Sequence, residues 1–207
     1  MKRIILAMTL ALVGLSVSAQ DCCAGKDSCG NNQVISTIMA RRSIRKYLDK
    51  PVEHAKLQVI AKCGINAPNG MNSQRWAVRV VESKEWIDGA TAVYKKANPQ
   101  AASDPNFKTM FRNAPTVICV ATPGGESSVD AGLMGENMIL AAQSLGLGTC
   151  CLGGPVNFLY TNDGCKPFIE KLNLPTGYKI SYMIAVGYPD EKPEARPRDE
   201  GKVEFIK

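Results

Sequence analysis

The 207-residue chain carries 25 Lys and Arg residues against 19 Asp and Glu residues, a formal net charge of +6. The basic residues are interspersed with acids and form no long stripe, so nucleic-acid binding is not indicated. The length suits one domain with a sizeable hydrophobic core, and beyond the N-terminus no apolar run is long enough for a stable membrane span.

Residues 1–19 have the pattern of a secretory signal peptide. Lys2-Arg3 precedes a nearly unbroken apolar run from Ile4 to Leu15, and a small-residue cleavage pattern ends at Ala19. We therefore predict export, with the periplasm as the expected destination and cleavage near Ala19. Cys22 follows Asp21 rather than a small residue, so lipoprotein anchoring is the less favoured alternative.

Residues 20–32 are a polar segment that contains Cys22, Cys23 and Cys29. We interpret it as a flexible tail with oxidisable thiols, with a disulfide-closed or metal-binding tail as the alternatives, because exported cysteines can be oxidised. The spacing is not a recognised zinc pattern and the only histidine, His54, is distant. We therefore predict no metal site.

Residues 33–207 are predicted to form one domain, which opens with an amphipathic helix from Val34 to Met39 whose apolar face turns into the core. A basic stretch follows at Arg41-Arg42-Ser43-Ile44-Arg45-Lys46-Tyr47. Guanidinium groups can bind phosphate oxygens through two parallel hydrogen bonds, and the Ser43 hydroxyl can add one. The stretch therefore indicates an anion site; the alternative is a solvated basic face beside a helix C-terminus, where cations are favoured.

A second helical pattern begins at Pro51 and ends in the turn-forming residues 66–70. Asn72 and Gln74 follow, just before a strand predicted from Trp76 to Val81. Their amides offer donors and acceptors at a fixed place, or they satisfy only the turn backbone. The apolar face of the helix consists of Leu57, Ile60, Ala61 and Ile65.

The middle of the chain alternates helical and strand patterns. These are a helix from Trp86 to Ala97, a polar loop from Asn98 to Asn106, an inner strand from Val117 to Ala121, a helix from Val129 to Leu145 and a last core strand from Tyr178 to Val186. We expect the helix from Val129 to be buried nearly all round, with Gly132 and Gly135 allowing close approach of another helix. Cys63 and Cys119 are predicted core residues.

A short strand is predicted around Cys150 and Cys151, whose side chains would point to opposite faces. It leads through Gly153-Gly154 into one helix carrying Phe158, Phe168 and Ile169. Without side chains, the two glycines leave backbone N–H groups available to a ligand, or they merely make the turn.

Three motifs together carry a family resemblance: the basic stretch, residues 67–76, and Gly187-Tyr188-Pro189 leading to Arg196-Pro197-Arg198. Their order and spacing resemble the FMN-dependent nitroreductase family from Val34 to the C-terminus. The resemblance implies an α+β fold, an α/β sandwich with a central, mostly antiparallel sheet flanked by helices. It also implies a homodimer in which a C-terminal arm, ending in residues 203–206, wraps the partner.

The resemblance further implies the cofactor-binding residues. The candidates are Arg41, Arg42, Ser43, Arg45, Arg196 and Arg198 for the FMN phosphate or pyrimidine edge, Pro68, Asn69, Asn72 and Gln74 for the flavin, and Gly153 and Gly154 for flavin N5. Arg42 would act through its backbone, and the residues from Pro68 onward would serve the neighbouring subunit. Arg75, where the family often has proline, and the short loop from Pro123 to Val129 are departures near the substrate pocket.

The sequence shows no Ser-His-Asp pattern and no Walker loop, so we expect no catalytic side chain and assign the chemistry to the flavin. The implied reaction is ping-pong: NADH or NADPH reduces FMN, and a nitroaromatic, a quinone or a similar small molecule takes the electrons. The alternative is a non-enzymatic exported flavin-binding or thiol redox-buffering protein. Flavin-fragmenting and dehalogenating relatives share the fold, but no charged lid favours them.

Overall fold

The computed structural model describes residues 32–126 and 128–207, and the chain divides into residues 1–39 and residues 40–207. The predicted leader and all but the last residue of the tail lie outside the described residues. Helix α1 (Gln33–Ala40) begins at Asn32, whose side-chain oxygen accepts hydrogen bonds from the N–H groups of Val34 at 2.9 Å and Ile35 at 3.2 Å. The helix itself was predicted correctly.

The prediction that α1 turns its apolar face into a core is wrong for the single chain. None of its eight residues is buried, and Val34 is 64% exposed. A two-turn helix buries an apolar stripe only where a second surface lies against it. Among all described helices, none is long and apolar enough to cross a lipid bilayer.

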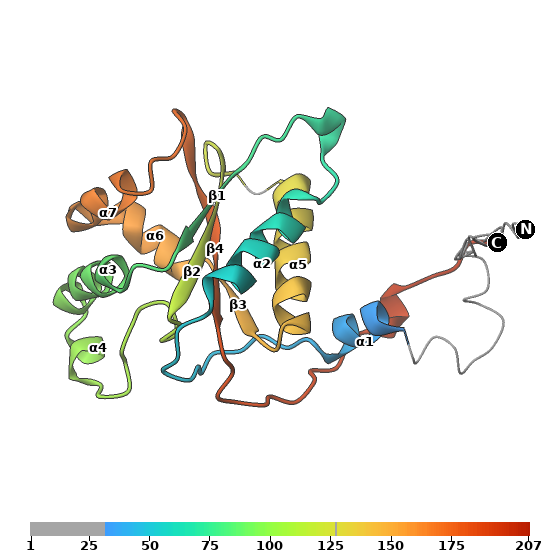
Figure 1. The fold of residues 1–207 in the computed structure, drawn as a ribbon, viewed down its shortest axis with the longest axis horizontal. Coiled ribbons are helices and arrows are strands. Elements are labelled where there is room, and N and C mark those ends of the chain that lie inside the picture. The colour runs from blue at the N-terminus through green and yellow to red at the C-terminus, as the bar shows by residue number, and fades with distance from the viewer. Residues whose placement is uncertain (1–31, 127) are drawn as a thin grey trace, which may run out of the picture. The chain divides into compact units, whose positions relative to one another are not determined.

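Residues 40–207 are built on one antiparallel sheet (Figure 1). Its strands are β1 (Ala77–Val81), β2 (Thr116–Pro123), β3 (Gly148–Leu152) and β4 (Tyr178–Gly187), in the order β1-β2-β4-β3. The central pair β2 and β4 places Val117 opposite Ala185 and Cys119 opposite Met183. Nearly all of β2 is buried, which explains why its sequence is continuously apolar rather than alternating.

Helices cover both faces of this sheet, which confirms the predicted sandwich (Figure 1). Helices α2 (His54–Ile65) and α5 (Val129–Ser144) lie on one face, and α3 (Lys84–Ala97), α6 (Gly154–Thr161) and α7 (Lys166–Glu170) on the other. The pair α2 and α5 packs closely, because a Cβ added to Gly64 would lie 2.5 Å from Cγ of Met138.

Strand residues alternate between the two hydrophobic cores. Cys119 and Cys150 point to the α3 side, whereas Ile118 and Ile184 point to the α2 and α5 side. As predicted, the adjacent thiols of Cys150 and Cys151 are on opposite faces, the first buried and the second exposed. Cys119 is fully buried as expected, but Cys63 is only half-buried.

Three predicted elements differ from the structure. The polar loop from Asn98 contains helix α4 (Pro99–Ser103), which begins with proline, a residue that suits the first helical turn. The single helix expected after Gly154 is divided into α6 and α7 by the 3₁₀ turn Asp163–Cys165, where the Asn162 side chain accepts a hydrogen bond from the Gly164 N–H. Competition by a side-chain acceptor ends the α-helical ladder there.

The third difference concerns which helix faces are buried. Helix α5 buries one stripe rather than its whole circumference, since Val129 is 78% and Leu133 43% exposed. On α2, Leu57 and Ile60 are buried as predicted, but Ile65 at the helix end is 48% exposed. Both helices therefore carry apolar side chains that the single chain does not bury.

We predict that Gly135→Ala destabilises the fold by about 1–3 kcal/mol through overpacking. An added Cβ would overlap the hydroxyl of Tyr182 and lie 3.0 Å from its Cζ, and this hydroxyl donates a hydrogen bond to the Ala131 carbonyl. The change in the free energy of unfolding is measured by urea denaturation. In a Tyr182→Phe background the same alanine should cost less, because the nearest atom is gone; equal costs in both backgrounds would refute the overlap.

Candidate functional site

Two segments far apart in the sequence line one basic cavity of about 340 Å³. Its wall consists of Arg41, Arg42, Ser43 and Arg45 from the stretch after α1, and Pro193, Glu194, Arg196 and Arg198 from the stretch after β4. The structure therefore brings together all six residues that the sequence proposed for a phosphate or pyrimidine edge.

Backbone hydrogen bonds hold the first of these segments against the sheet. The N–H of Ile44 donates to the Thr149 carbonyl at 2.8 Å, and Ser43 forms a parallel bridge with Thr149 at the start of β3. Gly148 makes this approach possible, since a Cβ there would lie 2.6 Å from Cγ1 of Ile44. The buried Tyr47 hydroxyl donates to the Ile44 carbonyl at 2.7 Å and fixes the bend.

The second segment is tied to the first where β4 ends. The Leu48 N–H donates to the Tyr188 carbonyl and the Asp190 N–H to the Lys46 carbonyl, both at 2.9 Å. The Tyr188 side chain fixes the same region to α2, because its hydroxyl donates to a Glu53 carboxylate oxygen at 2.6 Å and accepts from Lys56 Nζ at 2.7 Å. These contacts lead the chain from β4 past the basic stretch.

The charges of the basic cavity are largely uncompensated. Five arginines face a single acid, Glu194. Arg45 and Arg198 donate to neighbouring backbone carbonyls, and within the described ranges neither they nor Arg41 and Arg196 form an ion pair. The basic stretch and the segment after β4 bring their arginines to the same cavity. This arrangement favours binding of a polyvalent anion over a solvated basic face.

A second cavity of about 530 Å³ adjoins the first at Arg45, which lines both. Its wall includes the end of β3 with Gly153 and Gly154, Tyr94 of α3, and most of the residues between positions 104 and 113. A Cβ on either glycine would meet no atom within 4 Å, and Gly153 has an ordinary φ of −99°. Packing within the chain therefore does not require glycine at either position, and the missing side chains leave this part of the cavity open.

The turn that carries the predicted amide groups is strained and exposed. Met71, Asn72 and Gln74 have φ values of 52°, 52° and 48°, a region that costs non-glycine residues about 1–3 kcal/mol each. Asn69 Oδ1 accepts from the Gln74 N–H at 2.9 Å across the 3₁₀ turn Gly70–Asn72, and the side chain of Gln74 donates to that of Asn72 at 3.4 Å. Met71 is 99% exposed.

Within one chain, these turn residues do not line either cavity. Pro68, Asn69, Asn72 and Gln74 are absent from both walls, so the chain does not bring them to its own arginines. The side chains of Asn72 and Gln74 bond each other, and the side chain that bonds the turn backbone is that of Asn69. Their assignment to the neighbouring subunit stays a prediction.

Burial affects the protonation of several tyrosine and cysteine side chains of the domain. Burial raises the pKa of Tyr47 and of Tyr182, and it raises the pKa of the Cys119 thiol to about 12. The pKa of the Cys151 thiol is raised by desolvation and by Cys150, with Arg41 opposing. The side chains with raised pKa values are thus neutral near pH 7. The histidine His54 lies at the start of α2, where its ring contacts the Glu82 carboxylate.

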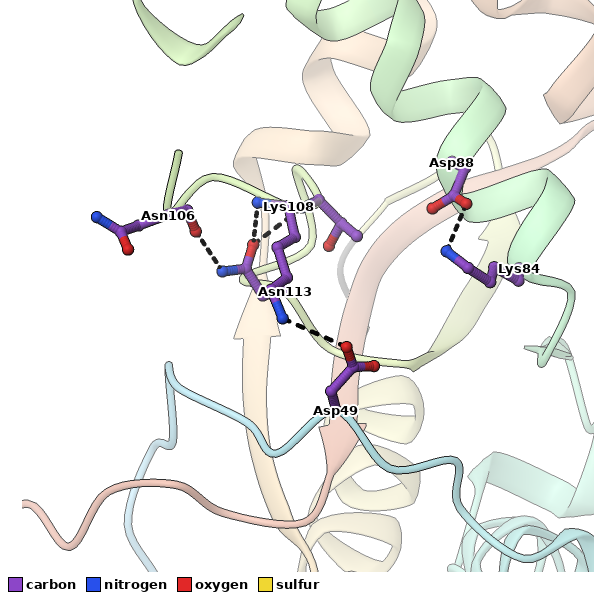
Figure 2. Close-up of polar contacts among 7 residues, drawn as sticks. Asp49, Lys84, Asp88, Asn106, Lys108 and Asn113 are labelled. Carbon is purple, nitrogen blue, oxygen red and sulfur yellow. Dashed lines mark hydrogen bonds and ion pairs between the residues drawn. The ribbon is translucent and has the colours of Figure 1, made fainter. Parts of the chain in front are cut away.

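Sequence reasoning missed the loop that closes the second cavity. Asn113 accepts hydrogen bonds from the N–H groups of Lys108 and Thr109, both at 2.9 Å, and donates to the Asn106 carbonyl at 2.8 Å (Figure 2). Arg112 and Asn113 both have positive φ, 61° and 62°. Asn113, three residues before the buried strand β2, is the available signal, since asparagine tolerates positive φ and bonds locally. No group of three His, Cys, Asp or Glu side chains among the described residues could hold a metal ion.

Comparison with known proteins agrees with this geometry. The sequence model of the nitroreductase family matches residues 38–188. The "NADPH-flavin oxidoreductase" of Vibrio harveyi is 30% identical over 176 residues, which cover 81% of this chain and 70% of the relative. The "FMN reductase [NAD(P)H]" of Bacillus subtilis is 28% identical over 186 residues, with the same two coverages.

Solved structures show the same similarity. A nitroreductase with bound FMN from Desulfitobacterium hafniense superposes with a TM-score of 0.73 at 25% identity, covering 85% of this chain and 99% of that one. An FMN-dependent nitroreductase from Clostridium difficile has a TM-score of 0.68 at 30% identity, with coverages of 84% and 99%.

Proposed function

Since this chain belongs to the nitroreductase family, we propose that it is an FMN-dependent oxidoreductase that takes electrons from NADH or NADPH and passes them to nitroaromatics, quinones or similar small acceptors. The observation that carries the proposal is the pair of adjoining cavities that share Arg45. One is strongly cationic and the other has open glycine amides, which matches a ligand with an anionic phosphate at one end and a flat ring at the other.

The residues present fit FMN. Arg41, Ser43, Arg45, Arg196 and Arg198 would hold its phosphate and pyrimidine edge, with Arg42 contributing through its backbone. Gly153 and Gly154 line the second cavity with no atom within 4 Å of their Cβ positions, and their N–H groups would donate to N5. When bound, the flavin supplies hydride transfer.

The size of the second cavity supports a ping-pong sequence. At about 530 Å³ it is too small to hold the flavin ring, a nicotinamide nucleotide and an acceptor at once, so donor and acceptor would occupy it in turn. The relatives named above are reductases that use NADPH or NAD(P)H, which favours an enzyme over a passive flavin carrier.

We also propose that the active unit is a homodimer with composite sites. Exposed apolar side chains of the described residues include some on α5, on the Gly70–Asn72 turn and on the C-terminal arm, where Phe205 is 82% and Ile206 86% exposed. The arm follows the 3₁₀ turn Glu200–Lys202. A two-fold interface that covers these surfaces would also bring Pro68, Asn69, Asn72 and Gln74 to the partner's flavin.

We propose export of the mature chain, from the basic, apolar and small-residue pattern of residues 1–19. N-terminal sequencing of protein from the native host should begin at Gln20, after cleavage at Ala19. Protein that keeps Met1 and stays in the cytoplasm would rule this out, and a lipid mass on Cys22 would favour anchoring instead.

Arg198→Gln should weaken FMN binding by about 1.5–3 kcal/mol, or roughly 10- to 150-fold, because a charged phosphate contact is lost. Quenching of flavin fluorescence gives the dissociation constant. Lys202→Gln is the matched control, since Lys202 is a cation of the same segment that pairs with Asp199 at 3.8 Å and lines neither cavity. Equal affinities for Arg198→Gln and the unchanged protein would contradict the phosphate assignment.

Mixed dimers test the composite site. Arg41→Ala and Asn72→Ala chains should each be poorly active alone, but co-expressed they should regain activity, because one of the two sites in a mixed dimer then has both residues intact. NAD(P)H oxidation by tag-purified mixed dimers is the measurement. The idea fails if mixed dimers are no more active than either parent, or if light scattering finds a monomer.

A further inference from the structure

We propose that the second cavity selects electron acceptors that carry an anionic group, and that Arg112 is the residue that binds this group. The inference rests on the proposed function, because it takes the second cavity as the place where the acceptor meets the flavin. It adds to that function a substrate class and a specificity-determining residue.

The lining of the second cavity combines cationic and aromatic side chains. Arg45 and Arg112 supply two positive charges, and Asp104 is the single acid of the wall. Tyr94 and Phe107 line the same cavity, with ring centroids 5.5 Å apart and planes inclined by 17°. An aromatic carboxylate has matching chemistry, since its ring can pack on the apolar side while its anion meets a guanidinium.

Arg112 is the cation of this cavity that the protein does not use elsewhere. Over the described residues, its guanidinium makes no ion pair and donates no hydrogen bond, and its side chain is exposed. By contrast, Lys108 of the same loop pairs with Asp49 at 3.4 Å, and Arg79 donates to the Leu172 carbonyl at 2.7 Å. Arg45 also lines the basic cavity, so Arg112 alone is dedicated to the second one.

The backbone under Arg112 is held in place before any ligand arrives. Residues 112 and 113 both have left-handed φ, and the Asn113 side chain bonds Lys108, Thr109 and Asn106 around them (Figure 2). On the inner side, the Met110 N–H donates to Thr91 Oγ1 at 3.3 Å. A loop fixed in this way loses little conformational entropy when its arginine binds an anion, which favours selectivity.

Nicotinamide nucleotides are a second source of anionic groups, because their phosphates could also meet Arg112. We assign Arg112 to the acceptor, because it belongs to the loop of residues 104–113 and not to the segment of Gly153 and Gly154 that would contact the flavin. The two sources are separated by measuring kcat/KM for donor and acceptor independently, as a ping-pong scheme allows.

The test compares 4-nitrobenzoate with 4-nitrobenzamide, which are similar in size but differ in charge. In the FMN-loaded protein, Arg112→Gln should lower kcat/KM for the anion about tenfold relative to the amide, the effect of losing one charged contact. Asp104→Asn keeps the side-chain acceptor for the Asn106 N–H and should shift the ratio toward the anion. Lys108→Gln removes a cation of the same loop outside the cavity wall and should leave the ratio unchanged.

An unchanged ratio in Arg112→Gln, or a loss confined to kcat/KM for NADH or NADPH, would overturn the inference. Failure of the proposed function looks different: the unaltered chain would take up no FMN or reduce neither acceptor. In that case calorimetric titration of the purified chain with benzoate and benzamide, in phosphate-free buffer, still decides the matter. Preferential benzoate binding that Arg112→Gln abolishes would support the anion site, and equal weak binding of both would refute it.

Discussion

The hydrogen bond from the Ile44 N–H to the Thr149 carbonyl sets the position of the whole site. It attaches the basic stretch to the outer strand β3, over Gly148, where no side chain interferes. The hydrogen bond from the Asp190 N–H to the Lys46 carbonyl then holds the segment after β4 beside the basic stretch. Five arginines thus meet in one cavity because of backbone pairing and a missing Cβ.

The sheet, the helices α2, α3 and α5, and the basic cavity could be predicted from the sequence. Their signals are local: a continuous apolar run for β2, a 3.6-residue period for the helices, and arginines clustered at both ends of the domain. The second cavity could not be predicted from the sequence. Its wall depends on hydrogen bonds between the Asn113 side chain and residues four to seven positions earlier. Such bonds arise from a loop conformation that composition does not specify.

The wrong predictions about buried helix faces share a physical cause. For α1, for Ile65 on α2 and for the outer face of α5, apolar residues were assigned to a core, yet the single chain leaves them exposed. Periodicity tells which residues share a helix face, but it does not tell which molecule covers that face. The division of α6 from α7 has a different cause, since the hydrogen bond from Gly164 to Asn162 outweighs a continuous helical pattern.

Arg45 lines both cavities, so a ligand bound in one of them changes the electrostatic potential in the other. An anion in the basic cavity draws the field and the donors of Arg45 toward itself and lowers the positive potential that a second anion meets next door. Because binding free energies are reciprocal, the second ligand weakens the first by the same factor. One side chain thereby gives the protein a built-in thermodynamic linkage between what it holds permanently and what it exchanges.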